Sequence, residues 1–314
     1  MIRMNRGLQN ETPTKAFKDF MIYNKARNLA DRTLDYYQEK LKRFLNWLEE
    51  TEVELKDINE KKISQYIIYL ESEFDIADTT VNAHLRAVRA FIYYCQKFEY
   101  VKEFKVQLIK TRKKVKETYK NPEIKVLLKK PNTRSCSFAI FRNWVIVNFL
   151  LGTGVRLSTL VNLRIGDLDF DNQLINLSHT KNRKAQIIPM SRTLFEVLQE
   201  YLLYRKGDKE GYLFCSQQTG KKLTTGGMQM AIKDYHLRRG VSTHSIHKYR
   251  HTFAKISIQN GVDAFTLMKL LGHSSISVTK EYVHLFSDDL KQKFNDYCPL
   301  EQFSSSGKES IKMR

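Results

Sequence analysis

The feature that most restricts the fold of this sequence is an interruption of its helical periodicity. Residues 12–100 carry apolar side chains at helical spacing, whereas 101–120 are rich in lysine and arginine and show little periodicity. Helical stripes bury their apolar faces against one another, so residues 12–100 predict a compact all-helical domain. With 314 residues, the chain can form a second core beyond the interruption. We predict a linker at 101–120, a second domain at 121–300 and a disordered tail at 301–314.

The first domain shows four sequence signals for helix starts. Thr12 precedes a proline, which is the usual order of an N-cap and a first helical residue. Each start is followed by an apolar stripe that burial in a core explains without a ligand. The predicted starts are Thr12, Asp31, Asn59 and either Thr79 or Thr80.

The sequence has a strong excess of positive charge, with 53 Lys and Arg against 34 Asp and Glu. A net charge of +19 favours a polyanionic partner such as nucleic acid. No apolar run approaches the roughly 20 residues of a membrane span, and the first ten residues do not resemble a secretory signal. The four cysteines are widely scattered, which argues against a disulfide framework and a zinc ribbon and favours a cytoplasmic protein.

Two basic regions are candidates for contact with a phosphate backbone. The predicted fourth helix of the first domain carries Asn82, Arg86 and Arg89 on one polar face, which is either a solvated face or a DNA contact. Lys113 and Lys114 lie in the linker. That segment can be a solvated tether, a basic strap across the phosphates, or both.

The second domain changes period once. After Pro122 the pattern is helical, but residues 165–190 contain three short strand-like runs at 168–170, 174–177 and 187–189, separated by turn residues. From 191 to 295 the pattern is again mainly helical. We therefore predict a mainly α protein with a small antiparallel β-sheet in the second domain.

A set of reactive residues is distributed along the second domain. Arg156 and Arg250 each offer a planar guanidinium fork that can hold two phosphate oxygens. His247 lies one helical turn before Arg250, and His273 follows a glycine. Tyr282 can attack phosphorus and retain it covalently. This combination favours cleavage of a phosphodiester without a metal, with the bond kept available for rejoining.

The departing sugar oxygen also needs a proton, and a lysine in a β-turn can supply it. Lys181 is the candidate, with Lys184 as its competitor in the same turn. His247 and His251 have the spacing of a zinc-protease helix, but Lys248 stands where that motif has its glutamate, which argues against a metal site.

These motifs resemble those of the tyrosine recombinases, the integrase and Xer superfamily. Residues 147–170, with Gly-Val-Arg-Leu-Ser, resemble the first arginine box of that family. Residues 247–284, from His-Lys-Tyr-Arg-His through Leu-Gly-His to Tyr-Val-His, resemble its second box and nucleophile. Residues 180–189 resemble the lysine hairpin, although the usual flanking glycines are missing. The helical first half is similar to the SAM-like core-binding domain, so the resemblance extends over 12–300.

The resemblance implies a two-domain clamp around double-stranded DNA, with the second domain as the catalytic one. Tyr282 would form a 3′-phosphotyrosine link, Arg156 and Arg250 would hold the phosphate, and Lys181 would protonate the leaving oxygen. His247 and His273 would supply hydrogen bonds or proton transfer. No cofactor or metal is implied.

The resemblance also implies how the protein would assemble. A monomer in solution would become a homo-tetramer that synapses inverted-repeat core sites and exchanges strands through a Holliday junction, in some systems with an accessory DNA-bending protein. Residues 288–295 resemble the segment through which neighbouring protomers dock.

Three functions remain open at this point. The chain can integrate or excise a mobile element, or it can resolve chromosome or plasmid dimers as Xer enzymes do. Residues 294–300 lack a His-Pro-Arg-like ending, which favours the mobile element. A non-catalytic DNA-binding clamp is the alternative from another class, but it predicts damage at a reactive position, and none is damaged.

Overall fold

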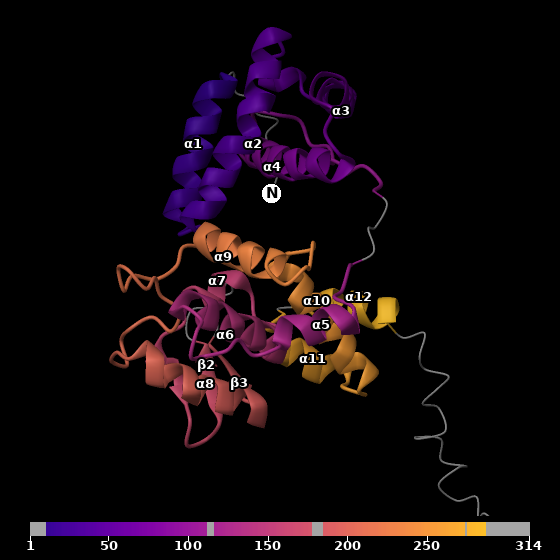
Figure 1. Ribbon diagram of the computed structural model, residues 1–314. Coiled ribbons are helices and arrows are strands. Elements are labelled where there is room, and N and C mark those ends of the chain that lie inside the picture. Colours follow the sequence, from indigo (N-terminus) through magenta and orange to yellow (C-terminus); the bar gives the residue numbers. More distant parts are fainter. Residues whose placement is uncertain (1–10, 112–115, 178–184, 274, 287–314) are drawn as a thin grey trace, which may run out of the picture. The chain divides into compact units, whose positions relative to one another are not determined.

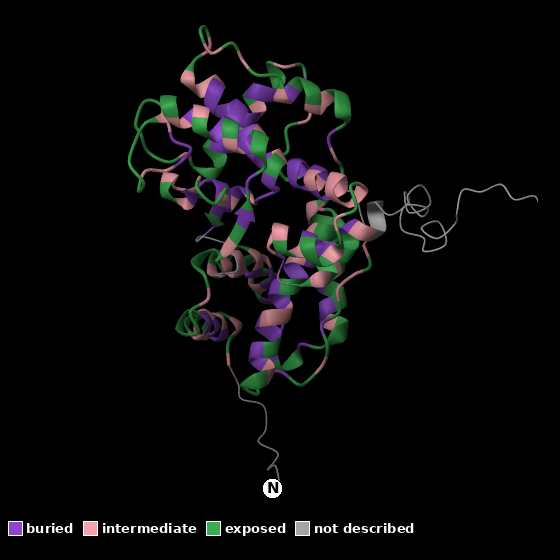
Figure 2. Ribbon diagram, turned by 90° about the horizontal axis from the view of Figure 1, so that it is seen from below, coloured by how far each residue is buried: buried purple, intermediate pink, exposed green. Residues whose placement is uncertain are grey.

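The structure of the protein is a computed structural model that describes residues 11–111, 116–177, 185–273 and 275–286. The chain divides into two compact units, Met1–Lys114 and Val115–Arg314 (Figure 1). In each unit the buried residues gather on the inward faces of the helices, and exposed residues cover the outside (Figure 2). No helix in the described part of the chain is both long enough and apolar enough to cross a membrane.

Over residues 11–111, the first unit is built from four α-helices and one 3-10 turn around an aromatic-rich core. Helix α4 packs against α2 and α1, and rings such as Phe44 and Phe91 are fully buried between them. The elements are α1 (Pro13–Ala26), α2 (Asp31–Glu50), η1 (Leu55–Asp57), α3 (Glu60–Phe74) and α4 (Asp78–Lys97).

The predicted helix starts are largely confirmed. The side chains of Thr12 and Asn59 accept hydrogen bonds from the backbone N–H groups of Lys15 and Lys62, the third residues of α1 and α3, as N-caps do. The exception is α4, which begins at Asp78 rather than at Thr79 or Thr80. Its N-cap is Ala77, which has no capping oxygen and therefore gives no signal in the sequence.

The basic segment after α4 is not a solvated tether along its described part. Val101 and Val106 are buried in the core of the first unit, and the Gln96 side chain donates hydrogen bonds to two backbone oxygens of this segment. Residues 101–111 therefore belong to the packing of the first unit. Lys113 and Lys114 lie outside the described residues.

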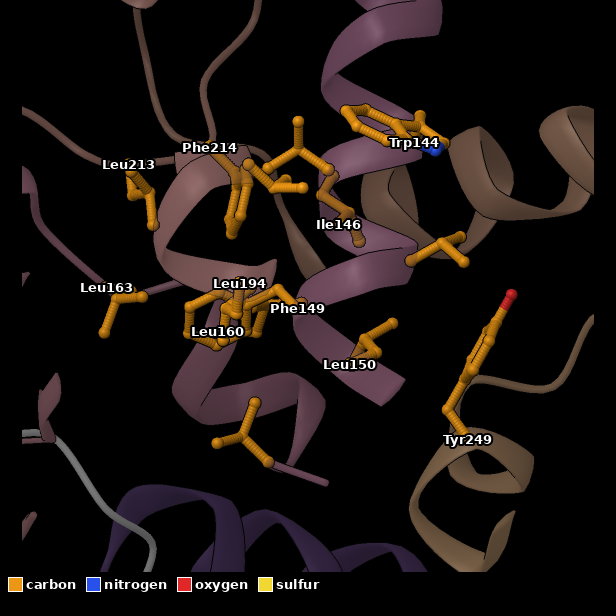
Figure 3. Packing of buried hydrophobic residues seen from close by; sticks show 14 of the residues in the cluster. Trp144, Ile146, Phe149, Leu150, Leu160, Leu163, Leu194, Leu213, Phe214 and Tyr249 are labelled. Carbon is orange, nitrogen blue, oxygen red and sulfur yellow. The ribbon is translucent and has the colours of Figure 1, made fainter. Parts of the chain in front are cut away.

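The second unit surrounds helix α6 (Phe138–Thr153), which is buried on nearly every side because its sequence is apolar all round. Ile146, Phe149 and Leu150 of this helix lie in one cluster with Leu194 of α8 and Phe214 (Figure 3). The other helices of the unit are α5 (Asn121–Leu128), α7 (Leu157–Leu160), η2 (Ile165–Asp167), α8 (Arg192–Arg205), α9 (Thr225–Leu237), α10 (Ile246–Gln259), α11 (Ala264–Leu271) and α12 (Ile276–Phe286).

The predicted sheet is present as three antiparallel strands in the order β1-β2-β3. The strands are β1 (Leu168–Asp169), β2 (Leu174–Leu177) and β3 (Gln186–Pro189). Leu177 pairs with Gln186, so this pair closes the described part of the β2–β3 hairpin. The turn itself, with Lys181 and Lys184, lies outside the described residues. The prediction of a mainly α fold with a small antiparallel sheet is confirmed.

Candidate active site

Two arginines meet at the carboxyl end of α11. Arg250, on α10, donates from its two terminal nitrogens to Gly154 O (2.8 Å) and Leu271 O (2.7 Å). Arg156, the N-cap of α7, donates to Gly272 O (3.1 Å). The last carbonyls of a helix have no partner within the helix and carry the negative end of its dipole. The same helix end therefore orients both guanidinium groups.

Gly272 allows the chain to turn at this point. It ends α11 with φ +60, a conformation that favours glycine, and a Cβ there would overlap Gln186 Oε1. Gln186 donates from its amide to Lys269 O (2.7 Å) and Leu270 O (2.8 Å). The first residue of β3 thus caps α11 and ties the hairpin to the arginine pair. Sequence reasoning missed Gln186, because nothing local distinguishes it from other polar strand residues.

Tyr282, on α12, is buried in contact with the same helices. Its hydroxyl lies 2.9 Å from His251 Nδ1, and its ring stacks on His273 with centroids 6.0 Å apart. Lys116 Nζ lies 4.0 Å from the centroid of the same ring and 2.9 Å from Glu281 Oε2. Burial raises the pKa of the Tyr282 phenol, while the charges of Arg250 and Arg156 oppose that effect. The arginines offset the effect of burial only in part, so the Tyr282 hydroxyl is a neutral phenol in this structure.

The two histidines beside Tyr282 are neutral near pH 7. Burial, followed by the charges of Arg250, Arg156 and Lys116, lowers the pKa of His273 to about 4. Burial also lowers the pKa of His251 to about 4, with smaller effects from Lys116, His247 and Arg250. His273 Nδ1 shares a hydrogen bond with a threonine hydroxyl of α12 at 2.8 Å. Both imidazoles therefore serve as neutral hydrogen-bonding groups.

Arg250 remains cationic despite its burial. Desolvation, and then the neighbouring Arg156, lowers the pKa of its guanidinium to about 10. That pKa still keeps the group charged at neutral pH. A guanidinium has five N–H donors, so the carbonyl contacts leave donors in both arginines for an anionic ligand.

The structure brings together Arg156, Arg250, His273 and Tyr282, but it leaves His247 apart from them. His247 is exposed in the first turn of α10, and its ring makes no hydrogen bond within the described part of the chain. It instead lines a surface cavity together with Lys233 and Lys248. Spacing alone predicted that His247 and Arg250 share a face, yet Arg250 is buried and His247 is not.

Sequence reasoning also missed two neighbours of Tyr282. His251 directly follows Arg250 and has the spacing of a metal motif with His247, but in the structure it is the histidine that contacts the tyrosine hydroxyl. Its adjacency to Arg250 in the His-Lys-Tyr-Arg-His run was the available signal. Lys116 had no such signal, because it is one lysine among many in a basic segment.

In the first unit, the prediction that Asn82 lies on an open polar face is wrong. The Asn82 side chain is buried and makes two hydrogen bonds with the backbone of Ile109. Asn82 Nδ2 donates to Ile109 O (2.9 Å), and Ile109 N donates to Asn82 Oδ1 (3.0 Å). This pairing anchors the segment after α4. Arg86 is exposed and Arg89 is partly exposed, and their contact with DNA stays a prediction.

Two family models match most of the chain. Residues 117–288 match the model of the Phage integrase family, and residues 16–100 match the N-terminal SAM-like domain of phage integrases. A tyrosine recombinase of Pseudothermotoga lettingae is 30% identical over 291 residues, covering 91% of this chain and 96% of that protein. Tyrosine recombinase XerD of Oceanobacillus iheyensis is 27% identical over 300 residues, covering 90% of this chain and 98% of that protein.

Solved structures share the fold. XerH site-specific recombinase bound to palindromic difH substrate has a TM-score of 0.68 at 21% identity, covering 87% of this chain and 82% of that one. The Tn1549 transposon integrase in complex with transposon right end DNA has a TM-score of 0.67 at 20% identity, covering 84% and 92%. The chain therefore belongs to the phage integrase family and is a tyrosine site-specific recombinase.

Proposed function

We propose that this recombinase cleaves and rejoins double-stranded DNA through a covalent phosphate ester on Tyr282. The observation that carries the proposal is the position of the buried Tyr282 hydroxyl beside His251 in a site that also holds Arg250 and Arg156. The arginines neutralise the charge that builds on the non-bridging oxygens as the phenol oxygen attacks, an effect that usually dominates such catalysis. His247 and His273 are the proposed hydrogen-bond partners of the phosphate, and His247, which is exposed in the structure, would have to reach it from the first turn of α10.

The leaving group completes the reaction. The new bond joins the Tyr282 oxygen to phosphorus, the bond from phosphorus to the 5′ oxygen breaks, and that oxygen takes a proton from Lys181, with Lys184 as the competing donor. The Gln186 contacts with α11 support this assignment, because they hold the base of the hairpin beside the arginine pair. A 5′ hydroxyl attacking the phosphotyrosine reverses every step and reseals a strand.

The DNA partner follows from charge and family. The net charge of +19 suits a polyanion, and the related structures named above contain DNA. We propose that the two units enclose a duplex carrying inverted repeats, with Arg86, Arg89, Lys113 and Lys114 on its phosphates. Four protomers, monomeric before binding, would exchange strands through a Holliday junction, with or without an accessory DNA-bending protein.

For the biological role we propose integration or excision of a mobile element in the cytoplasm. The likeness of the fold to that of the Tn1549 transposon integrase supports this role. Resolution of chromosome or plasmid dimers is the second candidate. It is favoured by relatives named XerC and XerD, which match about nine tenths of the chain.

A nicked suicide duplex made from the DNA that flanks the gene tests the chemistry. The wild-type protein is expected to become covalently attached, and Tyr282→Phe is expected to abolish attachment because no nucleophile remains. Tyr204→Phe is the matched control, since this tyrosine is 53% exposed on α8. Tight binding without an adduct on any candidate duplex would instead support a non-catalytic clamp.

A second assay with two recognition sites tests strand exchange. Joined products between the sites are expected from a recombinase. Nicking and relaxation without joining would indicate a topoisomerase-like activity and refute ordered exchange.

A further inference from the structure

His251 is in hydrogen-bond distance of the oxygen that would attack phosphorus. Its Nδ1 lies 2.9 Å from the Tyr282 hydroxyl, and the two ring centroids are 5.6 Å apart. The other histidines of the site are placed differently. His273 faces the Tyr282 ring and uses its Nδ1 for a threonine of α12, while His247 is exposed. The hydroxyl therefore meets His251 rather than the two histidines of the sequence motif.

The surroundings of His251 keep its imidazole neutral. Three basic side chains face the imidazole: Lys116 from the segment before α5, and His247 and Arg250 from α10. The Tyr282 hydroxyl faces it from α12. Burial and these charges lower the pKa of His251 to about 4. A neutral imidazole has one nitrogen without a proton, which can accept the phenol O–H.

We infer that His251 is a catalytic residue that accepts the proton of Tyr282 during strand cleavage; this inference rests on the proposed role of Tyr282 as the nucleophile. As the phenol oxygen bonds to phosphorus, its proton moves to His251 Nδ1. The 5′ oxygen that leaves phosphorus takes its proton from a separate donor, which is Lys181 or Lys184 in the function proposed above. Resealing returns the proton from His251 to the phenol oxygen, so protons balance in both directions.

Bound DNA would make His251 a better base than it is in the empty site. A phosphodiester between Arg156 and Arg250 adds a negative charge that offsets the arginine charges, and a nearby anion favours the imidazolium. Lys116, 4.0 Å from the Tyr282 ring centroid, remains a cation beside the developing phenolate. Proton transfer is thereby coupled to occupation of the phosphate site.

The variant His251→Asn separates proton transfer from orientation. Asparagine Oδ1 can take the place of Nδ1 and accept a hydrogen bond, but it is not a base at neutral pH. In single-turnover cleavage of the suicide duplex at saturating protein, the rate is expected to fall by about 10²–10⁴-fold, the usual contribution of a positioned acid or base. Duplex affinity is expected to remain unchanged. His244→Asn is the matched control, because His244 is exposed in the loop before α10.

A fluorinated tyrosine incorporated at position 282 provides the decisive readout. Its phenol is more acidic and needs less help to lose a proton, so the defect of His251→Asn is expected to shrink. A defect of unchanged size with the fluorinated residue would show that His251 acts only in packing and would overturn the inference. A cleavage rate of His251→Asn within about threefold of wild type would do the same. If thermal melting shows that His251→Asn does not fold, His251→Gln undergoes the same measurements.

The Tyr282→Phe variant distinguishes this inference from the proposed function. If Tyr282→Phe still forms the adduct, the nucleophile is wrong and both proposals fall. If Tyr282→Phe is inactive while His251→Asn cleaves normally, only the role of His251 is refuted.

Discussion

Replacing Gly272 with alanine tests how the end of α11 is held beside the arginines. Gly272 has φ +60, where a residue with a Cβ costs about 1–2 kcal/mol. The added Cβ also overlaps Gln186 Oε1 and forces that amide to leave its two hydrogen bonds, each of which contributes about 0.5–1.5 kcal/mol. Gly272→Ala should therefore lower the free energy of unfolding of the second unit by about 2–5 kcal/mol.

Gly240→Ala is the matched control for this measurement. Gly240 has φ +71, but nothing lies within 4 Å of its added Cβ, so only the backbone cost of about 1–2 kcal/mol is expected. Urea unfolding can be followed through Trp144 in a Trp47→Phe background, because the two tryptophans of the chain lie one in each unit. Separate reporters matter because a protein of two units need not unfold in one step.

A double-mutant cycle isolates the contribution of Gln186. In the Gln186→Ala background the hydrogen bonds are already lost, so Gly272→Ala should cost only its backbone part. The two single changes should therefore sum to about 1–3 kcal/mol more than the double change. Additive costs, or equal costs for Gly272→Ala and Gly240→Ala, would refute the assignment of Gln186 as the cap of α11.

Two further outcomes are expected. Folding lowers the pKa values of His251 and His273 from 6.5 to about 4, so between these pH values the unfolded state binds more protons than the folded state. The free energy of unfolding should therefore fall as the pH drops from 6.5 toward 4, and it should fall less steeply in His251→Asn. Urea midpoints measured across this pH range test both expectations. Asn82→Ala leaves both backbone groups of Ile109 without their partner and should destabilise the first unit by about 1–3 kcal/mol, seen as lost amide-exchange protection at Ile109.

Each of these outcomes has its own control. Equal pH slopes for wild type and His251→Asn would show that His251 is not held neutral by folding. For the first unit, the free energy of unfolding of Arg86→Ala should stay within about 0.5 kcal/mol of wild type. The slope of its DNA affinity against salt should fall by about 1, the loss of one phosphate contact. If Asn82→Ala weakens DNA binding with intact exchange protection, Asn82 is a DNA contact after all.

Much of the fold could be read from local patterns. The caps at Thr12 and Asn59, the apolar helix around Trp144 and the strands at 174–177 and 187–189 all follow from side-chain chemistry within a few residues. The start of α4 was missed because Ala77 has no capping group. The segment after α4 was misjudged because its lysines conceal Val101 and Val106, which are buried by helices distant in sequence.

The candidate site shows the same division between local and distant information. Residue types and order were enough to select Arg156, Arg250, His273 and Tyr282, since few side chains can hold a phosphate or attack it. They could not decide between His247 and His251, which lie one turn apart on α10. Only the packing of α12 against α10 determines that the tyrosine hydroxyl meets His251.

The sequence by itself determined two helical bodies and a small sheet between helices, and it selected the candidate reactive residues. These depend on periodicity, capping and side-chain chemistry, which act over a few residues. The tertiary structure decided which groups share a partner. Two arginines and Gln186 bind the carboxyl end of α11, and His251 and Lys116 both contact Tyr282. Asn82 binds the backbone of Ile109. Such contacts join residues separated by tens of positions, and their geometry depends on how whole helices pack.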